Sequence, residues 1–100
     1  MGQVLETVQS VRAKREEIQK IAAKHGAQNV RVFGSVARGE SRSGSDLDLL
    51  IETGPKVTSW FPGGLVYDLE ALLGCRVDVV TETGLHPPLR ESVLKDARSL

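Results

Sequence analysis

The sequence has too few cysteines for a disulfide framework and no apolar run long enough to cross a membrane. Its single cysteine, Cys75, has no second cysteine in the chain to pair with, and disulfides belong mainly to secreted proteins. Apolar runs stay far below the ~20 residues that a spanning helix needs. No apolar segment followed by a cleavage site opens the chain. These absences predict a cytoplasmic protein.

The chain also lacks an excess of charge of either sign. Lys and Arg contribute 13 positive charges, Asp and Glu contribute 13 negative ones, and the formal net charge at pH 7 is zero. Proteins that bind nucleic acids or anionic membranes usually carry a basic surface. Direct nucleic-acid binding is therefore not expected.

The length predicts one domain over residues 1–100. A chain of this size can build a single modest core, but it has no room for a second domain that would hold a substrate. A second substrate would therefore have to be carried by another protein.

The first part of the chain, from about residue 3 to residue 25, has helical periodicity. Charged residues occupy one face, and the other face carries apolar residues at helical spacing, namely Val4, Val8, Val11, Ile18 and Ala22. Gly26 stands where a left-handed cap would end a helix. The pattern predicts one amphipathic helix that packs on a sheet.

The remaining elements alternate between strands and helices. The patterns predict strands at 30–33, 47–51 and 76–81 and helices at 36–38, 62–73 and 89–97. In the last helix, Leu89, Val93 and Ala97 are expected to face the body. The order α-β-α-β-α-β-α predicts a small α/β domain with a mixed three-stranded sheet and flanking helices.

A loop rich in glycine and proline, from about residue 53 to residue 64, carries two large apolar residues, Trp60 and Phe61. Three interpretations stay open for this pair. The side chains fold back over the edge of the core, or they stack on a nucleobase, or they contact a partner protein.

The stretch from residue 32 to residue 52 carries the strongest signal for chemistry. Asp46 and Asp48 stand at the start of a predicted strand, so their side chains project to one face, roughly 6.6 Å apart along the backbone. Two carboxylates this close repel each other, and burying them without a partner is unfavourable. The pair therefore predicts a bound cation, and hard oxygen ligands suit Mg²⁺ or Mn²⁺.

A Gly-Ser turn precedes the two aspartates by ten residues. Gly34 allows the backbone to approach a ligand closely, neighbouring N–H groups can bind a phosphate, and Ser35 adds a hydroxyl donor. Arg38 either offsets the charge of a triphosphate or pairs with one of the aspartates. Ser45, in the connecting loop with Arg42, is a weaker candidate for nucleotide binding.

A third acidic residue, Asp78, interrupts an otherwise β-branched strand. A carboxylate is unfavourable there for sheet packing alone, so it needs another reason. If this strand pairs beside residues 46–48, all three aspartates can converge on one site. The alternative is a salt bridge from Asp78 to Arg76, Arg38 or Arg42.

Other common sites do not fit the sequence. The stretch 34–39 lacks the Gly-Lys-Ser/Thr ending of an ATPase phosphate loop. His25 and His86 have no second histidine, cysteine or carboxylate at a useful spacing, which predicts structural or surface roles for both.

The Gly-Ser turn and the two aspartates that follow it together resemble the signature of the DNA polymerase β-like nucleotidyltransferases. They resemble in particular the signature of the minimal nucleotidyltransferase (MNT) family. The resemblance covers nearly the whole chain and is carried by Gly34, Ser35, Ala37, Arg38, Gly39, Ser45, Asp46, Asp48 and Leu49. It implies the polymerase β-like fold and a third metal-binding acid from a later strand, a position that Asp78 fills.

Two-metal nucleotidyl transfer follows from the resemblance. One Mg²⁺ on Asp46 and Asp48 would hold the triphosphate of ATP, and a second Mg²⁺, also bound by Asp78, would activate an acceptor hydroxyl. Asp78 is also the candidate general base. We expect loss of any one of the three to remove transfer and to leave the fold intact.

The resemblance also implies a partner. Minimal nucleotidyltransferases are typically antitoxins that transfer AMP to a tyrosine of a helical HEPN-family ribonuclease toxin. Two alternatives stay open: an antitoxin that neutralises its partner by contact alone, supported by the apolar loop of Trp60 and Phe61, and a small-molecule nucleotidyltransferase. The second is disfavoured because such enzymes need additional substrate-binding structure.

Overall fold

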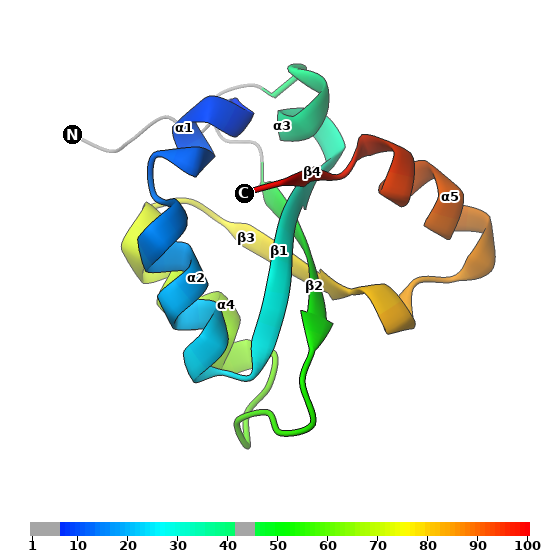
Figure 1. Cartoon of the computed structure of the whole chain (residues 1–100). Helices are drawn as coiled ribbons and strands as arrows, with labels where there is room; N and C mark the ends of the chain where they lie inside the picture. Colours follow the sequence, from blue (N-terminus) through cyan, green and yellow to red (C-terminus); the bar gives the residue numbers. More distant parts are fainter. Residues whose placement is uncertain (1–6, 42–45) are drawn as a thin grey trace.

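A computed structural model describes residues 7–41 and 46–100 and contains a sheet of four strands in the order β3-β2-β1-β4 (Figure 1). The strands are β1 (Ala27–Phe33), β2 (Leu47–Thr53), β3 (Val77–Thr81) and β4 (Arg98–Ser99). β2 pairs antiparallel with β1 and parallel with β3, and β4 pairs antiparallel with β1. The predicted α/β class and mixed sheet are confirmed, with one strand more than the three expected.

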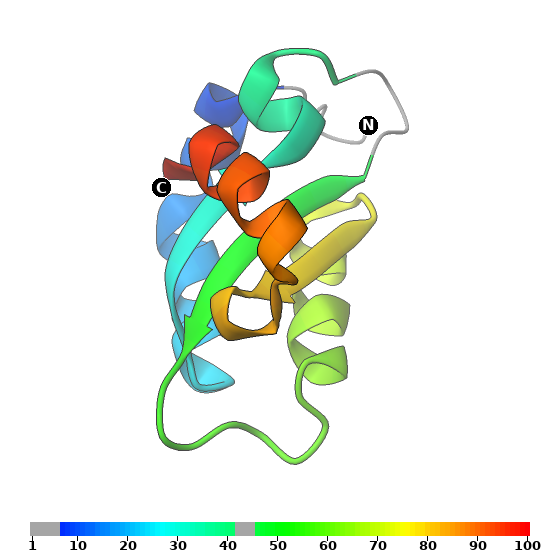
Figure 2. The same ribbon diagram turned by 90° about the vertical axis from the view of Figure 1, so that its right-hand side faces the viewer.

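Helices cover both faces of this sheet. The two views show α2 and α4 on one face and α5 on the other (Figures 1 and 2). The helical elements are α1 (Val8–Arg12), α2 (Arg15–Lys24), α3 (Gly34–Arg38), α4 (Gly63–Leu73), the 3₁₀ turn η1 (Glu82–Gly84) and α5 (Pro87–Asp96). None of the helices in the described ranges is both long and apolar enough to span a bilayer.

The alternation of side chains along β2 separates the core from the opposite face. Leu47, Leu49 and Ile51 are buried in the main core with residues of α2 and α4. Leu50 is also fully buried but stands on the other face of the pleat, where α5 lies. Asp48 shares the face of Leu50, so the core helices do not cover it.

The N-terminal amphipathic segment forms two helices, so the prediction of one continuous helix is wrong. Lys14, between α1 and α2, leaves the helical conformation with φ −107° and ψ 15°. Val11 and Ile18 are both fully buried, as the periodicity predicted. No glycine or proline marks the break, so the sequence pattern could not locate it. The part of the prediction at residues 3–6, with Val4, lies outside the described residues.

Two arginines of these helices hold the end of the chain against the sheet. Arg12 donates from Nε and Nη2 to the carbonyl oxygen of Ser99, at 3.1 and 2.8 Å. Arg15 donates from Nη1 to the carbonyl oxygen of Leu100, at 3.2 Å.

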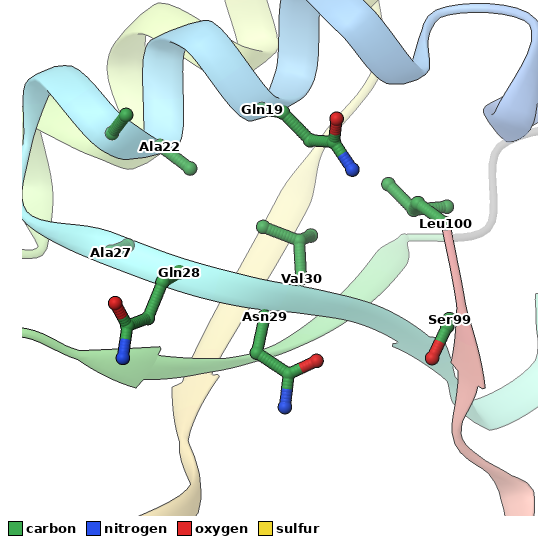
Figure 3. Close-up of a pocket in the computed structure, with 9 residues that line it drawn as sticks. Gln19, Ala22, Ala27, Gln28, Asn29, Val30, Ser99 and Leu100 are labelled. Atoms are coloured by element: carbon green, nitrogen blue, oxygen red, sulfur yellow. The ribbon is translucent and has the colours of Figure 1, made fainter.

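Beyond β4, a groove of about 290 Å³ runs between α2 and the edge of β1 (Figure 3). It lies at the β1 edge of the sheet, away from the aspartates of β2 and β3.

The last helix lies within two residues of its predicted bounds, but its orientation differs from the prediction. α5 begins at Pro87 and ends at Asp96. Leu89 was expected to face the body, but its side chain is 57% exposed, whereas Val93 is half-buried. The periodicity was too weak to orient the helix, because α5 buries no residue fully.

A buried histidine anchors the loop between β2 and α4. His25 is 7% exposed, and its Nδ1 lies 2.8 Å from the hydroxyl of Thr58 while its Nε2 lies 2.7 Å from Asp68 Oδ2. The hydrogen bond from His25 is the main reason why the pKa of Asp68 is lowered. His25 therefore has the structural role that was predicted. Its carboxylate partner, Asp68, is 43 residues further along the chain, so no sequence spacing indicates the pair.

We expect His25→Ala to lower the free energy of unfolding by about 2 kcal/mol, because the change removes two hydrogen bonds and leaves a small cavity. Chemical denaturation at pH 7 measures the loss. His86→Ala is the matched control, since His86 is exposed and makes no side-chain cap hydrogen bond. Equal stability of the two variants would contradict the anchoring role of His25.

Candidate active site

Two carboxylates meet on neighbouring strands at one end of the sheet. In the parallel ladder of β2 and β3, Asp48 is the register partner of Asp78. Paired residues on adjacent strands point to the same face, so both side chains stand on the face that carries α5. Asp48 is half-buried and Asp78 is exposed. The predicted pairing of the third strand beside the Asp-x-Asp strand is confirmed.

Asp46 lies just before β2 and is paired with a basic side chain. Arg76 Nε lies 3.7 Å from Asp46 Oδ1, and the two side chains are 83% and 46% exposed. An ion pair this open contributes little to stability. The salt bridge considered for Asp78 thus goes from Arg76 to Asp46 instead, and no basic side chain of the described ranges lies within ion-pair distance of Asp78.

The three aspartates share one end of the sheet, but they do not form a compact ligand set. Within residues 7–41 and 46–100, no three His, Cys, Asp or Glu side chains are close enough together to hold a metal ion. The donor set is nevertheless that of a hard divalent ion, because it consists only of carboxylates, two of them in direct register. These residues therefore fit Mg²⁺ by their chemistry.

Burial and the neighbouring carboxylates both shift the pKa of Asp48. Burial, then the neighbouring charges of Asp78 and Asp46, raise the pKa of Asp48 to about 6. The positive charge of Arg38 acts in the opposite direction. At neutral pH an ionised Asp48 therefore costs the fold stability, and a bound cation would relieve that cost.

We expect Asp48→Asn to be more stable than wild type at pH 8 in EDTA, by about 1 kcal/mol after solvent screening is allowed for. When folding raises the pKa of a carboxyl, the free energy of unfolding falls as the pH rises from about 4 to about 6. Above that range the loss is complete. The stability difference should therefore shrink toward pH 4. Thermal melting across this pH range measures it, and a difference that stays constant with pH would contradict the assignment.

The Gly-Ser turn packs directly against one of these carboxylates. Gly34 opens α3 with a positive φ of 73°, and a Cβ atom added there would collide with Oδ2 of Asp48. Only glycine can therefore bring the backbone this close to the aspartate. Ser35 follows in the first turn of the helix, and Phe33 provides no side-chain cap for the N–H groups of that turn. The turn thus brings the backbone of Gly34 beside Asp48, one of the two paired carboxylates.

Arg38, at the end of the same short helix, is paired with two other acids. Its Nε donates to Glu40 Oε2 at 3.0 Å and its Nη1 donates to Asp96 Oδ2 at 2.7 Å. The hydrogen bond to Asp96, followed by that to Glu40, raises the pKa of Arg38. The alternative in which Arg38 pairs with one of the site aspartates is therefore wrong. Its ion pairs leave it charged at the edge of the site.

Sequence reasoning did not identify Asp96 as the partner of Arg38. The two residues are 58 positions apart, and no local pattern links them. Two weaker candidates, Ser45 and Arg42, lie outside the described residues.

The apolar pair in the β2–α4 loop has divided roles. Phe61 packs against the core, as one interpretation proposed. Trp60 is 69% exposed and lies over Gly63. The loop follows the end of β2, whereas Asp48 stands near its start, roughly 16 Å earlier along the strand. Stacking of Trp60 on a nucleobase held at the carboxylates is therefore not supported.

The geometry agrees with comparisons to known proteins. A family model described as a nucleotidyltransferase domain matches residues 12–100. A protein of Methanocaldococcus jannaschii, provisionally named a protein adenylyltransferase, is 39% identical over 83 residues, which cover 83% of this chain and 89% of that protein. Protein adenylyltransferase MntA of Thermococcus cleftensis is 36% identical over 91 residues, covering 81% of this chain and 90% of that one.

Solved structures give the same picture of the fold. A structure provisionally described as a minimal nucleotidyltransferase superposes with a TM-score of 0.81 at 51% identity, covering 94% of this chain and 96% of that one. A chain of a toxin–antitoxin complex with AMP-PNP superposes with a TM-score of 0.70 at 20% identity, covering 87% of this chain and 69% of that one. At that identity the second match supports the fold alone.

Proposed function

This chain belongs to the nucleotidyltransferase domain family, and from that premise we propose that it is a protein adenylyltransferase that uses ATP and acts as the antitoxin of a toxin–antitoxin pair. The acceptor in this proposal is a tyrosine hydroxyl of a HEPN-family ribonuclease toxin. The observation that carries the proposal is the register pair of Asp48 and Asp78 beside the Gly34 turn.

The proposal assigns a role to each residue of the site. Gly34 and Ser35 would bind the β and γ phosphates of ATP through backbone N–H groups and a hydroxyl. Asp46, Asp48 and Asp78 would hold two Mg²⁺ ions. Bound there, Mg²⁺ supplies charge neutralisation for the triphosphate and lowers the pKa of an acceptor hydroxyl.

The transfer step exchanges one P–O bond for another. The tyrosine oxygen forms a bond to the α-phosphorus of ATP, the bond from that phosphorus to the bridging oxygen of the β phosphate breaks, and pyrophosphate leaves. The hydroxyl proton goes to Asp78, which is exposed and therefore accessible to an acceptor carried by another molecule. Arg38 offsets negative charge at the edge of the site.

A protein acceptor is supported by the exposure of Asp78 and by the relatives. MntA of Thermococcus cleftensis is a protein adenylyltransferase, and a chain of this fold occurs in a toxin–antitoxin complex with AMP-PNP.

Incubation with labelled ATP, Mg²⁺ and the HEPN-family toxin that the proposal names as partner tests the proposal. We expect one labelled AMP on a tyrosine of that protein, found by mass spectrometry, and no label with the Asp46→Ala, Asp48→Ala double variant. Label that stays absent with wild type, or that persists in the double variant, would overturn the proposal.

A second candidate function, neutralisation by contact alone, is favoured by the exposure of Trp60 and Tyr67, at 69% and 67%. The same double variant separates the two functions in cells that express the toxin. A binding antitoxin would still restore growth without its aspartates, whereas an adenylyltransferase would not.

A further inference from the structure

The guanidinium of Arg38 is held by two carboxylates of different kinds. Glu40 is two residues further along the chain, its side chain is 60% exposed, and it receives the bond from Nε. Asp96 comes from another element, α5, its side chain is 20% exposed, and it receives the shorter bond from Nη1. Asp96 is therefore the better shielded of the two partners.

Asp96 is itself fixed to the sheet. It ends α5, and Ala97 donates from its backbone N to the carbonyl oxygen of Val93 at 3.0 Å. The guanidinium of Arg98 then donates to three successive carbonyl groups, those of Lys95, Asp96 and Ala97. Arg98 pairs in β4 with Val32 of β1. Figure 2 shows this end of α5 running up to α3, and the two helices are in contact.

The two ion pairs leave Arg38 able to bind an anion. A guanidinium has five N–H donors, and Glu40 and Asp96 take one each, from Nε and Nη1. Among residues 7–41 and 46–100, no acceptor takes the two N–H groups of Nη2, so both can bind a phosphate oxygen. The side chain of Arg38 is 46% exposed, so a ligand in solution can reach it.

We propose that Asp96 is a positioning residue, which holds the Arg38 guanidinium at the Gly34–Ser35 turn so that its remaining N–H groups can bind the phosphates of the nucleotide. The inference rests on the proposed function. An arginine side chain that is free in solution must lose rotamer freedom when it binds a phosphate, and Asp96 removes that freedom beforehand. The rigid link from α5 to β1 makes Asp96, rather than Glu40, the residue that sets the position.

Titration calorimetry with the Mg²⁺ complex of AMP-PNP, on the full chain, tests this inference. We expect Asp96→Ala to weaken binding by about 10-fold, as loss of one charged hydrogen-bond partner predicts. We expect Arg38→Ala to weaken it at least as much, and Asp96→Ala added to Arg38→Ala to have no further effect, because Asp96 acts through Arg38.

Glu82→Gln is the matched control for a merely structural effect. Glu82 is as shielded as Asp96, at 21%, and bonds Arg31 of β1 and Arg90 of α5 at 2.8 and 3.2 Å, at the other end of that helix. We expect this variant to lower the melting temperature as Asp96→Ala does and to leave the affinity for AMP-PNP unchanged.

Any one of the following results would overturn the inference. The affinity for AMP-PNP could fall as much in Glu82→Gln as in Asp96→Ala, or it could fall further when Asp96→Ala is added to Arg38→Ala. It could also rise in Asp96→Ala, which would mean that Asp96 competes with the nucleotide for Arg38. If wild type binds no nucleotide, the proposed function fails and takes the inference with it. If wild type binds and Asp96→Ala binds equally well, only the inference fails.

Discussion

An Asp78→Asn variant is expected to fold like wild type and to lose about 1,000-fold in the rate of adenylyl transfer. Asp78 contributes two things to the proposed reaction, a carboxylate oxygen for Mg²⁺ and a base for the hydroxyl proton. Asparagine keeps the size of the side chain but removes both the charge and the basic oxygen. The strand itself is unaffected, because the backbone makes its ladder with β2 and the Asp78 side chain is exposed.

The measurement is single-turnover transfer of labelled AMP, together with a thermal melt. Glu91→Gln is the control, since it also neutralises one exposed acid and lies on α5 away from the strands. We expect the control to retain wild-type activity. An Asp78→Asn enzyme that keeps a tenth of wild-type activity would remove this residue from the site and leave Asp46 and Asp48 without a third ligand.

The sequence predicted the elements whose signals are local. Alternation of Asp48 with Leu47 and Leu49 identified a strand with one acidic and one apolar face, and the structure buries the two leucines and leaves the aspartate half-buried on the opposite face. The sequence predicted that the backbone at Gly34 approaches a ligand closely. Its neighbour proved to be the carboxylate of Asp48 itself. Local pattern therefore sufficed to predict the strand that carries Asp48 and the close approach of the backbone at Gly34.

The features that sequence reasoning missed depend on contacts between distant segments. β4 has two residues, which is too short for any periodicity, and it exists because Arg98 and Ser99 meet the free edge of β1. His25 contacts Asp68, which is 43 residues away. Arg38 likewise pairs with Asp96, which is 58 residues away. A spacing rule cannot reveal such pairs, because the fold and not the spacing brings them together.

The second large effect is expected at the turn beside the carboxylates, where Gly34→Ala should reduce transfer by about 100-fold or more. Alanine at a positive φ costs roughly 1 kcal/mol, and at this position its Cβ would also collide with Asp48 Oδ2. Either the turn moves away or the aspartate rotates, and both movements separate the phosphate donors from the carboxylate pair. The loss should therefore appear in AMP-PNP affinity and in transfer rate together.

Gly74→Ala separates the displacement of Asp48 from backbone strain. Gly74 has nearly the same φ, 69° against 73° at Gly34, but a Cβ added there meets nothing within 4 Å. Both variants should lose about 1 kcal/mol of stability in denaturant melts, while Gly74→Ala keeps wild-type transfer. If the two variants lost activity equally, strain alone would account for both losses, and the contact between Gly34 and Asp48 would have no part in catalysis. A loss confined to Gly34→Ala would tie the activity to that contact, because strain is the same in both variants and only the neighbour of the new methyl group differs.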